Sequence, residues 1–126
     1  DDTVVLIKKN RPDWQRNLLN GVGGKIENDE SPLDAIIREF KEETSVIVNN
    51  WTHFLSYEAN NDIVYWFYSY HDEYLPIKSM TDETVTYYNR FDYHHQENSI
   101  IDINWIIPFG YVSKILSYNL PIYIKR

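Results

Sequence analysis

Three glutamates that lie close together in the chain could bind a divalent metal ion. Glu39, Glu42 and Glu43 are spaced i, i+3 and i+4, and on a helix this spacing brings them to one face within reach of one another. In water the repulsion between such carboxylates costs only about 0.2 to 0.5 kcal/mol per pair. In a cleft it would cost several times more unless a divalent cation lay among them. The spacing alone therefore leaves two interpretations open, a metal site and a solvated acidic helix face.

The composition limits which metals and partners are compatible with this cluster. The chain has no cysteine, which excludes disulfides, thiolate zinc sites and cysteine nucleophiles. The remaining oxygen ligands favour Mg²⁺ or Mn²⁺ over zinc. A formal net charge of −7 argues against binding to long nucleic acid, which normally requires a basic face. A small phosphorylated substrate stays compatible, because metal ions and one or two Lys or Arg can meet its charge locally.

A helix is expected to carry the glutamates. Ser31 followed by Pro32 predicts a helix start, with the serine as cap and the proline at the first helical position, and the helix should run to about Thr44. Apolar residues recur at i, i+3, i+4 and i+7 and form a stripe opposite the acidic side: Leu33, Ile36, Ile37 and Phe40. Just before the helix, residues 21–24 hold three of the four glycines of the chain, so the backbone there must approach something closely or bend sharply.

The rest of the chain predicts a single domain, residues 1–126, in which strands outnumber helices. Strands are expected at residues 3–8, 46–48, 51–57, 63–70 and 104–107, with a hairpin turn at 60–62. Residues 72–99 are polar and acidic and are interpreted as a long irregular loop or an excursion at the edge of the sheet, and residues 111–118 as a short helix before an extended tail. This mixture favours an α+β class or α/β/α layers.

Membrane insertion is not expected from the hydropathy. The longest apolar runs, such as residues 63–68, are far shorter than the roughly 20 residues that cross a bilayer. The start of the sequence also lacks the charged, apolar and small-residue pattern of a signal peptide. We therefore expect a cytoplasmic protein.

The residues around the glutamates resemble the Nudix box, the signature of the Nudix (MutT-type) family. That pattern is G-x5-E-x7-R-E-U-x-E-E-x-G-U, where U is a bulky aliphatic or aromatic residue. Eight of its nine specified positions match at the correct spacing, and they are Gly24, Glu30, Arg38, Glu39, Phe40, Glu42, Glu43 and Val46. The departure is Ser45, where the family has a glycine that commonly takes a left-handed conformation. A serine can adopt this conformation at a cost of about 1 kcal/mol, so we expect an altered helix exit and retained metal binding.

The resemblance implies a fold and a set of site residues. The fold would be an α/β/α sandwich around a mixed β-sheet, with the box helix packed on one face. Glu39, Glu42 and Glu43 would bind Mg²⁺ or Mn²⁺, and the carbonyl of Gly23 or Gly24 would complete the site. One of these glutamates, or a carboxylate elsewhere, would help to deprotonate the attacking water.

Further residues are implied around this centre. Arg38 would orient the carboxylates by pairing with Glu42 or with Glu30. An additional metal ligand outside the box could be Glu97 or Asp102, although for either one singly a solvated loop acid is the favoured interpretation.

The segment from Asn20 to Lys25, N-G-x-G-G-K, is similar to Nudix enzymes that hydrolyse nucleoside triphosphates, including oxidised-purine triphosphatases. The resemblance implies that Asn20 recognises the base and that Lys25 binds phosphate. The alternatives are a turn residue before Gly21 and a solvated lysine. Oxidised-purine enzymes also carry an acidic pair near the C-terminus, and residues 114–121 contain no acid, which puts oxidised-purine selectivity in doubt. At least one aromatic residue of 65–68 is expected to line the pocket.

The predicted activity is metal-dependent hydrolysis of the diphosphate linkage in a nucleoside triphosphate or a related nucleoside diphosphate-X, which releases a nucleoside monophosphate. Alternative substrates are ADP-ribose, a dinucleotide or capped RNA, although the negative net charge speaks against the last. A further alternative is a non-catalytic Nudix nucleotide-binding module. The expected partners are a small nucleotide and, because homodimers are frequent in the family, a second copy of the chain; no membrane and no long nucleic acid are expected.

Overall fold

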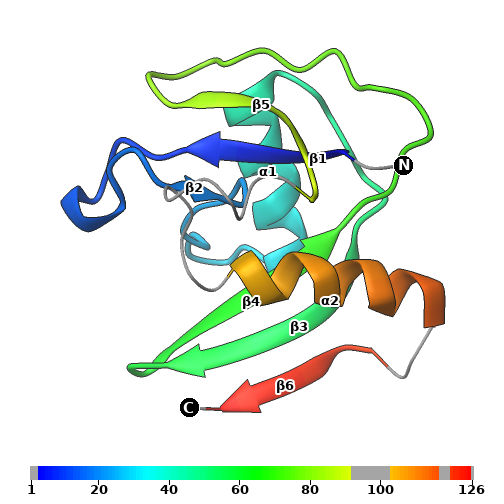
Figure 1. Cartoon of the computed structure of the whole chain (residues 1–126). Coiled ribbons are helices and arrows are strands. Elements are labelled where there is room, and N and C mark those ends of the chain that lie inside the picture. Colours follow the sequence, from blue (N-terminus) through cyan, green and yellow to red (C-terminus); the bar gives the residue numbers. More distant parts are fainter. Residues whose placement is uncertain (1–2, 92–102, 117–119, 126) are drawn as a thin grey trace.

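The computed structural model describes residues 3–91, 103–116 and 120–125. These residues fold into two three-stranded sheets, two α-helices and one short 3-10 helix (Figure 1). In chain order the elements are β1 (Thr3–Lys8), η1 (Asp13–Gln15), β2 (Leu19–Asn20), α1 (Pro32–Thr44), β3 (Thr52–Ala59), β4 (Asp62–Tyr68), β5 (Thr84–Asn89), α2 (Ile103–Leu116) and β6 (Ile122–Lys125). The predicted α+β class is confirmed.

The strands form one antiparallel and one mixed sheet. The first sheet has the order β2-β1-β5, and β1 pairs along its whole length with β5, from Thr3 opposite Asn89 to Lys8 opposite Thr84. The second has the order β4-β3-β6, with β3 antiparallel to β4 and parallel to β6. In the view of Figure 1, α1 lies behind β1 and α2 lies in front of β3. Within the described ranges, no helix has the length and apolar character to cross a membrane.

The helix α2 joins the two sheets through the core. Its Ile103 packs with Leu6 of β1 in one buried cluster, and its Ile106 packs with Phe54 and Leu55 of β3 in another. Trp66 of β4 is partly buried against both clusters. These contacts fix the position of β4, whose aromatic side chains form part of the candidate site.

The helix that carries the glutamates begins and ends where the sequence predicts. Ser31 caps it, because its Oγ accepts a hydrogen bond from the Asp34 N–H at 3.0 Å, and Pro32 is the first helical residue. The helix ends at Ser45, which has φ of 67° and ψ of 1°. Ser45 therefore takes the left-handed conformation that the family's glycine commonly has, and the expected altered helix exit is not found in its backbone. On the buried side of the helix, Phe40 packs edge-to-face against Trp51, with ring centroids 5.3 Å apart.

The end of α1 is completed by a distant segment of the chain. The backbone N–H of Lys78 donates to the Thr44 carbonyl at 3.0 Å, and that of Met80 donates to the Glu43 carbonyl at 3.2 Å. The last carbonyls of a helix have no partner within the helix, so residues 78–80 supply partners that the helix lacks.

The predictions for residues 51–57, 63–70 and the hairpin turn are confirmed with shifted ends, as β3, β4 and a turn in which Asn60 and Asn61 both have positive φ. Two strand predictions are wrong: residues 46–48 form no strand, and residues 104–107 belong to α2. The predicted helix at 111–118 is the second half of α2. The first half could not be recognised from the sequence, because Pro108 and the apolar residues around it do not favour a helix. A helix forms there nevertheless, because the proline removes only one helical hydrogen bond and the burial of Ile103 and Ile106 outweighs that loss.

Of the two interpretations of residues 72–99, the long irregular loop is wrong, because residues 84–89 form β5 at an edge of the first sheet; residues 92–99 lie outside the described residues. This strand has Val85 buried between the exposed Thr84 and Thr86, so its polar face dominates the local composition. Pairing with β1 decides its conformation, and that pairing cannot be read from the segment alone.

Candidate active site

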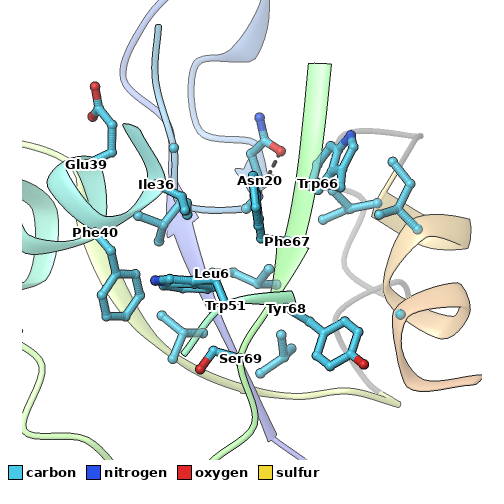
Figure 2. Close-up of a pocket in the computed structure, with 18 of the residues that line it drawn as sticks. Leu6, Asn20, Ile36, Glu39, Phe40, Trp51, Trp66, Phe67, Tyr68 and Ser69 are labelled. Carbon is cyan, nitrogen blue, oxygen red and sulfur yellow. Dashed lines mark hydrogen bonds between the residues drawn. The ribbon is translucent and has the colours of Figure 1, made fainter. Parts of the chain in front are cut away.

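The three box glutamates are spaced along one side of α1, and Glu39 lines a large cavity. In Figure 2, Glu39 projects from α1 at the edge of this cavity, while Ile36 and Phe40 of the same helix point toward its apolar side. The side chain of Glu39 is 15% exposed and that of Glu42 is 56% exposed. Glu39 is therefore largely withdrawn from water at the rim of the cavity, whereas Glu42 is mostly exposed and Glu43 is half-buried.

Arg38 holds one end of this row. Its Nε and Nη2 donate to the two Glu30 carboxylate oxygens at 2.7 and 2.9 Å, and Nη2 also donates to the Lys25 carbonyl at 2.9 Å. Nη1 donates to one oxygen of Glu39 at 2.8 Å and to one of Glu42 at 3.3 Å. The predicted pairings with Glu30 and Glu42 are both present. One planar guanidinium thus fixes three carboxylates and the loop before the helix.

The charge of Glu30 is stabilised by these contacts. Hydrogen bonds from Arg38 and from the Glu27 N–H lower the pKa of Glu30 to about 2, although desolvation opposes the shift. The hydrogen bonds with Glu30 and Glu39 in turn raise the pKa of Arg38. Both members of the pair stay charged over the physiological pH range, so the orientation of Glu39 does not depend on pH there.

Gly24 explains why the box needs a residue without a side chain. A Cβ at Gly24 would overlap the Glu39 carboxylate, whereas a Cβ at Gly23 would meet no atom within 4 Å. None of the described glycines has positive φ, so the requirement at Gly24 is one of space and not of backbone conformation. The glycine lets the Glu39 carboxylate rest directly on the backbone that precedes α1.

Glu43, at the other end of the row, is crowded by negative charge. Its pKa is raised chiefly by burial and also by the charges of Glu83 and Glu39, although a hydrogen bond from Thr81 Oγ1 to its Oε2 at 3.0 Å opposes the shift. A divalent cation would relieve this crowding.

Glu83 is the residue that the sequence analysis missed. Its side chain is only 4% exposed, and its carboxylate accepts hydrogen bonds from the Asn10 N–H at 2.6 Å and from Lys9 Nζ at 3.3 Å. Burial opposes its ionisation, but these donors keep its pKa below the ordinary value. An acid immediately before an alternating strand at 84–89 was the available signal. The two candidates for an extra carboxylate, Glu97 and Asp102, lie outside the described residues.

The residues present suit a hard divalent cation by their chemistry. Among the residues that the structure describes, no three His, Cys, Asp or Glu side chains already form a metal-binding group. Arg38 Nη1 contacts one oxygen each of Glu39 and Glu42 and leaves the second oxygen of each outside that contact. All side-chain ligands on offer are carboxylate oxygens, which Mg²⁺ and Mn²⁺ prefer.

The cavity beside the glutamates has a volume of about 1200 Å³. It is lined by the predicted substrate residues Asn20 and Lys25, by Gly23, Gly24 and Glu39, and by all four aromatic residues of positions 65–68. The prediction that one of these aromatic residues lines the pocket is confirmed, and Figure 2 shows Trp66, Phe67 and Tyr68 along its wall. The structure therefore brings the glycine-rich loop, one box glutamate and an aromatic surface to the same cavity.

Comparison with known protein families matches a NUDIX domain over residues 1–106. The chain belongs to the Nudix family, and its α+β architecture is the Nudix fold. Members of this family are in general hydrolases of nucleoside diphosphate-X compounds, and they generally use divalent metal ions.

A segment of the chain is similar to a bacterial relative. It is 42% identical over 50 residues to the uncharacterized Nudix hydrolase YvcI of Bacillus subtilis (strain 168). The match covers 40% of this chain and 29% of that protein, so the chain spans less than a third of the relative.

Proposed function

We propose that this chain is a Mg²⁺-dependent hydrolase, with Mn²⁺ as a substitute, that cleaves the diphosphate linkage of a nucleoside triphosphate or a related nucleoside diphosphate-X and releases a nucleoside monophosphate. The observation that carries the proposal is the row of Glu39, Glu42 and Glu43 on α1, of which Glu39 lines the aromatic cavity. A solvated acidic helix face would need neither the arginine that fixes two of these carboxylates nor the glycine beneath Glu39.

The site residues have separate roles in the proposed reaction. Glu39, Glu42 and Glu43, with the carbonyl of Gly23 or Gly24, would hold the cation, which when bound offsets charge on the attacking and leaving oxygens. Arg38 orients Glu39 and Glu42. One of these glutamates, or a carboxylate elsewhere, would accept the proton of the attacking water, and the raised pKa of Glu43 suits it to this role.

The substrate would lie in the cavity with its phosphates toward α1 and its base toward β4. Lys25 stands beside the box and would meet the phosphate charge, while Asn20 would meet the base. Both residues line the cavity, which supports this orientation.

A dinucleotide or ADP-ribose is the second candidate substrate. The cavity volume of about 1200 Å³ exceeds the roughly 300 to 1,000 Å³ of most small-molecule sites and leaves room for a second nucleoside or sugar. The non-catalytic binding module is less well supported, because the box glutamates and Arg38 are all retained.

Hydrolysis measured across a substrate panel tests the proposal. Nucleoside triphosphates, oxidised dGTP, ADP-ribose and dinucleotides are incubated with Mg²⁺, and product release is compared between the wild type and Glu43→Gln. We expect a kcat at least about 100-fold lower in the variant, with an unchanged unfolding temperature. The control is Asp34→Asn, which removes one exposed charge from the first turn of the same helix. Full activity in Glu43→Gln would contradict the site, and tight binding without turnover would favour the binding module.

A further inference from the structure

The short helix η1 presents a glutamine to the cavity next to Asn20. The backbone of Gln15 is held on both sides, since its N–H donates to the Pro12 carbonyl at 2.9 Å and its carbonyl accepts from the Leu18 N–H at 2.8 Å. Gln15 and Asn20 are both partly buried, and both line the cavity that contains Glu39. The hairpin between β1 and β2 therefore places two side-chain amides together at a fixed position.

Hydrogen bonds fix which way each amide points. The Gly21 N–H can only donate, so the Asn20 atom 2.8 Å from it is the oxygen Oδ1 (Figure 2, dashed line). The other end of Asn20 is then the Nδ2 amine, which donates to Gln15 Oε1 at 3.3 Å. This contact makes the free end of the Gln15 amide its Nε2 amine. Both orientations follow from one backbone N–H.

Each amide oxygen of this pair already accepts one hydrogen bond, Oδ1 from the Gly21 N–H and Oε1 from Asn20 Nδ2, and the amine hydrogens without a partner are donors. One hydrogen remains on Asn20 Nδ2 and two remain on Gln15 Nε2. Within the described part of the chain, no other protein acceptor contacts either nitrogen. The pair therefore offers a cavity ligand three amine hydrogens and one further lone pair on each oxygen, and a ligand that uses the hydrogens must carry acceptors on the facing edge.

An aromatic wall stands beside this pair. A Cβ at Gly21 would lie 3.1 Å from Cζ3 of Trp66, so the indole rests directly against the residue that follows Asn20. Figure 2 shows Trp66 next to Asn20 at the same end of the cavity. An aromatic surface beside a polar edge is the surrounding that a nucleobase requires.

Purines differ in the edge that they would present to these donors. Guanine offers two neighbouring acceptors, O6 and N7, whereas adenine offers the N7 acceptor beside the N6 amino donor. Oxidation of guanine at C8 places a hydrogen on N7 and converts that acceptor to a donor. Only unoxidised guanine and related 6-oxopurines thus present two acceptors on this edge.

We propose that Gln15, a residue outside the Nudix box, is a positioning residue that orients the Asn20 amide so that the site prefers guanine over both adenine and 8-oxoguanine. The inference rests on the proposed function, because it takes the cavity to hold a nucleotide. It adds a base preference to the proposed function, and it assigns this preference to the side chains of Gln15 and Asn20.

Calorimetric titration of the full chain in Mg²⁺ buffer with GMP, AMP and 8-oxo-GMP tests the base preference. Monophosphates are products of the proposed reaction and are not consumed during the titration. We expect GMP to bind about 10-fold more tightly than AMP or 8-oxo-GMP, which is the discrimination usual for a bidentate contact to a base edge. Equal affinities, or tighter binding of AMP or 8-oxo-GMP, would overturn the inference.

The substitution Gln15→Glu tests the role of the pair. The carboxylate can still accept from Asn20 Nδ2, but it replaces the Nε2 donors with an acceptor. Its added charge weakens all three nucleotides alike, so the ratio of affinities is the quantity to compare. We expect the GMP-to-AMP ratio to fall about 10-fold while the unfolding temperature stays unchanged. A ratio equal to that of the wild type would overturn the role of Gln15.

A matched control comes from the same element. Asp13→Asn alters η1 at a side chain that is 98% exposed, and it should leave the ratio unchanged. A ratio lowered equally in this variant would show that any disturbance of η1 suffices, and it would overturn the assignment to Gln15.

The two proposals fail in different ways. Hydrolysis of triphosphates at equal kcat/KM for every base would remove the inference and leave the proposed function standing. Preferential GMP binding without any turnover would uphold the inference and remove the proposed activity. Neither binding nor hydrolysis of any nucleotide would overturn both.

Discussion

The two ends of the glutamate row are held in different ways. Glu39 is fixed by Arg38 and by Gly24, so its partners come from the box itself. Glu43 is surrounded by Thr81 and Glu83, which follow it by about 40 residues in the chain. A motif therefore describes the first end completely and the second end only in part. The comparison suggests that substitutions far from the motif can alter the chemistry as much as substitutions within it.

At the Glu39 end of the row, the largest effect is expected from Gly24→Ala. The new methyl group would displace the Glu39 carboxylate, and we expect kcat/KM for the best substrate of the panel to fall about 10- to 100-fold. Stability should change little, because the displaced atoms are the end of a flexible side chain. Gly23→Ala is the matched control, since its methyl group would meet no atom within 4 Å. Similar losses in both variants would show that the close approach to Glu39 is not what matters.

The Glu43 end of the row is tested by the substitution Glu83→Gln. The variant keeps an acceptor for the Asn10 N–H but removes the charge that faces Lys9 and Glu43. We expect activity to fall about 10-fold and the free energy of unfolding to fall by about 1 kcal/mol. The acid limb of the pH-rate profile should also move to lower pH, because the pKa of Glu43 loses one of the charges that raise it.

Two measurements check this expectation, the pH dependence of kcat and urea unfolding. The neighbouring Asp82→Asn serves as control, because Asp82 is 53% exposed and pairs with Arg11 at the surface. Wild-type activity in Glu83→Gln would mean that the box alone determines the site, and the contrast between the two ends would disappear.

The smallest effect concerns the pairing of Glu30 with Arg38. The pKa of Glu30 in the folded protein is about 2, below its ordinary value of 4.5. A lowered pKa stabilises the fold above pH 4.5, and this contribution is lost as the pH falls toward 2. We therefore expect Glu30→Gln to unfold more easily than the wild type at pH 6 and to approach it near pH 2. A difference in stability that stays constant across this range would show that the charge of Glu30 is not the cause.

The features that could be predicted from the sequence depend on near neighbours in the chain. The cap at Ser31, the helix end at Ser45 and the pairing of Arg38 with Glu30 all join residues within one short segment. The β5 strand and the first half of α2 could not be predicted, because Val85 pairs with Ile7 of β1 and Ile103 packs against Leu6 of β1. The place of Glu83 beside the site could not be predicted for the same reason, since its burial depends on the loop that follows β1.

The hydrogen bonds from Lys78 and Met80 to the end of α1 carry a consequence for the evolution of chain length. They set the register of the following residues, so that Thr81 reaches Glu43 and Glu83 reaches Asn10. One residue gained or lost between positions 78 and 83 would move both side chains away from their partners. Relatives that keep this arrangement should vary in length between β4 and Lys78, and the six residues from 78 to 83 should stay constant in number.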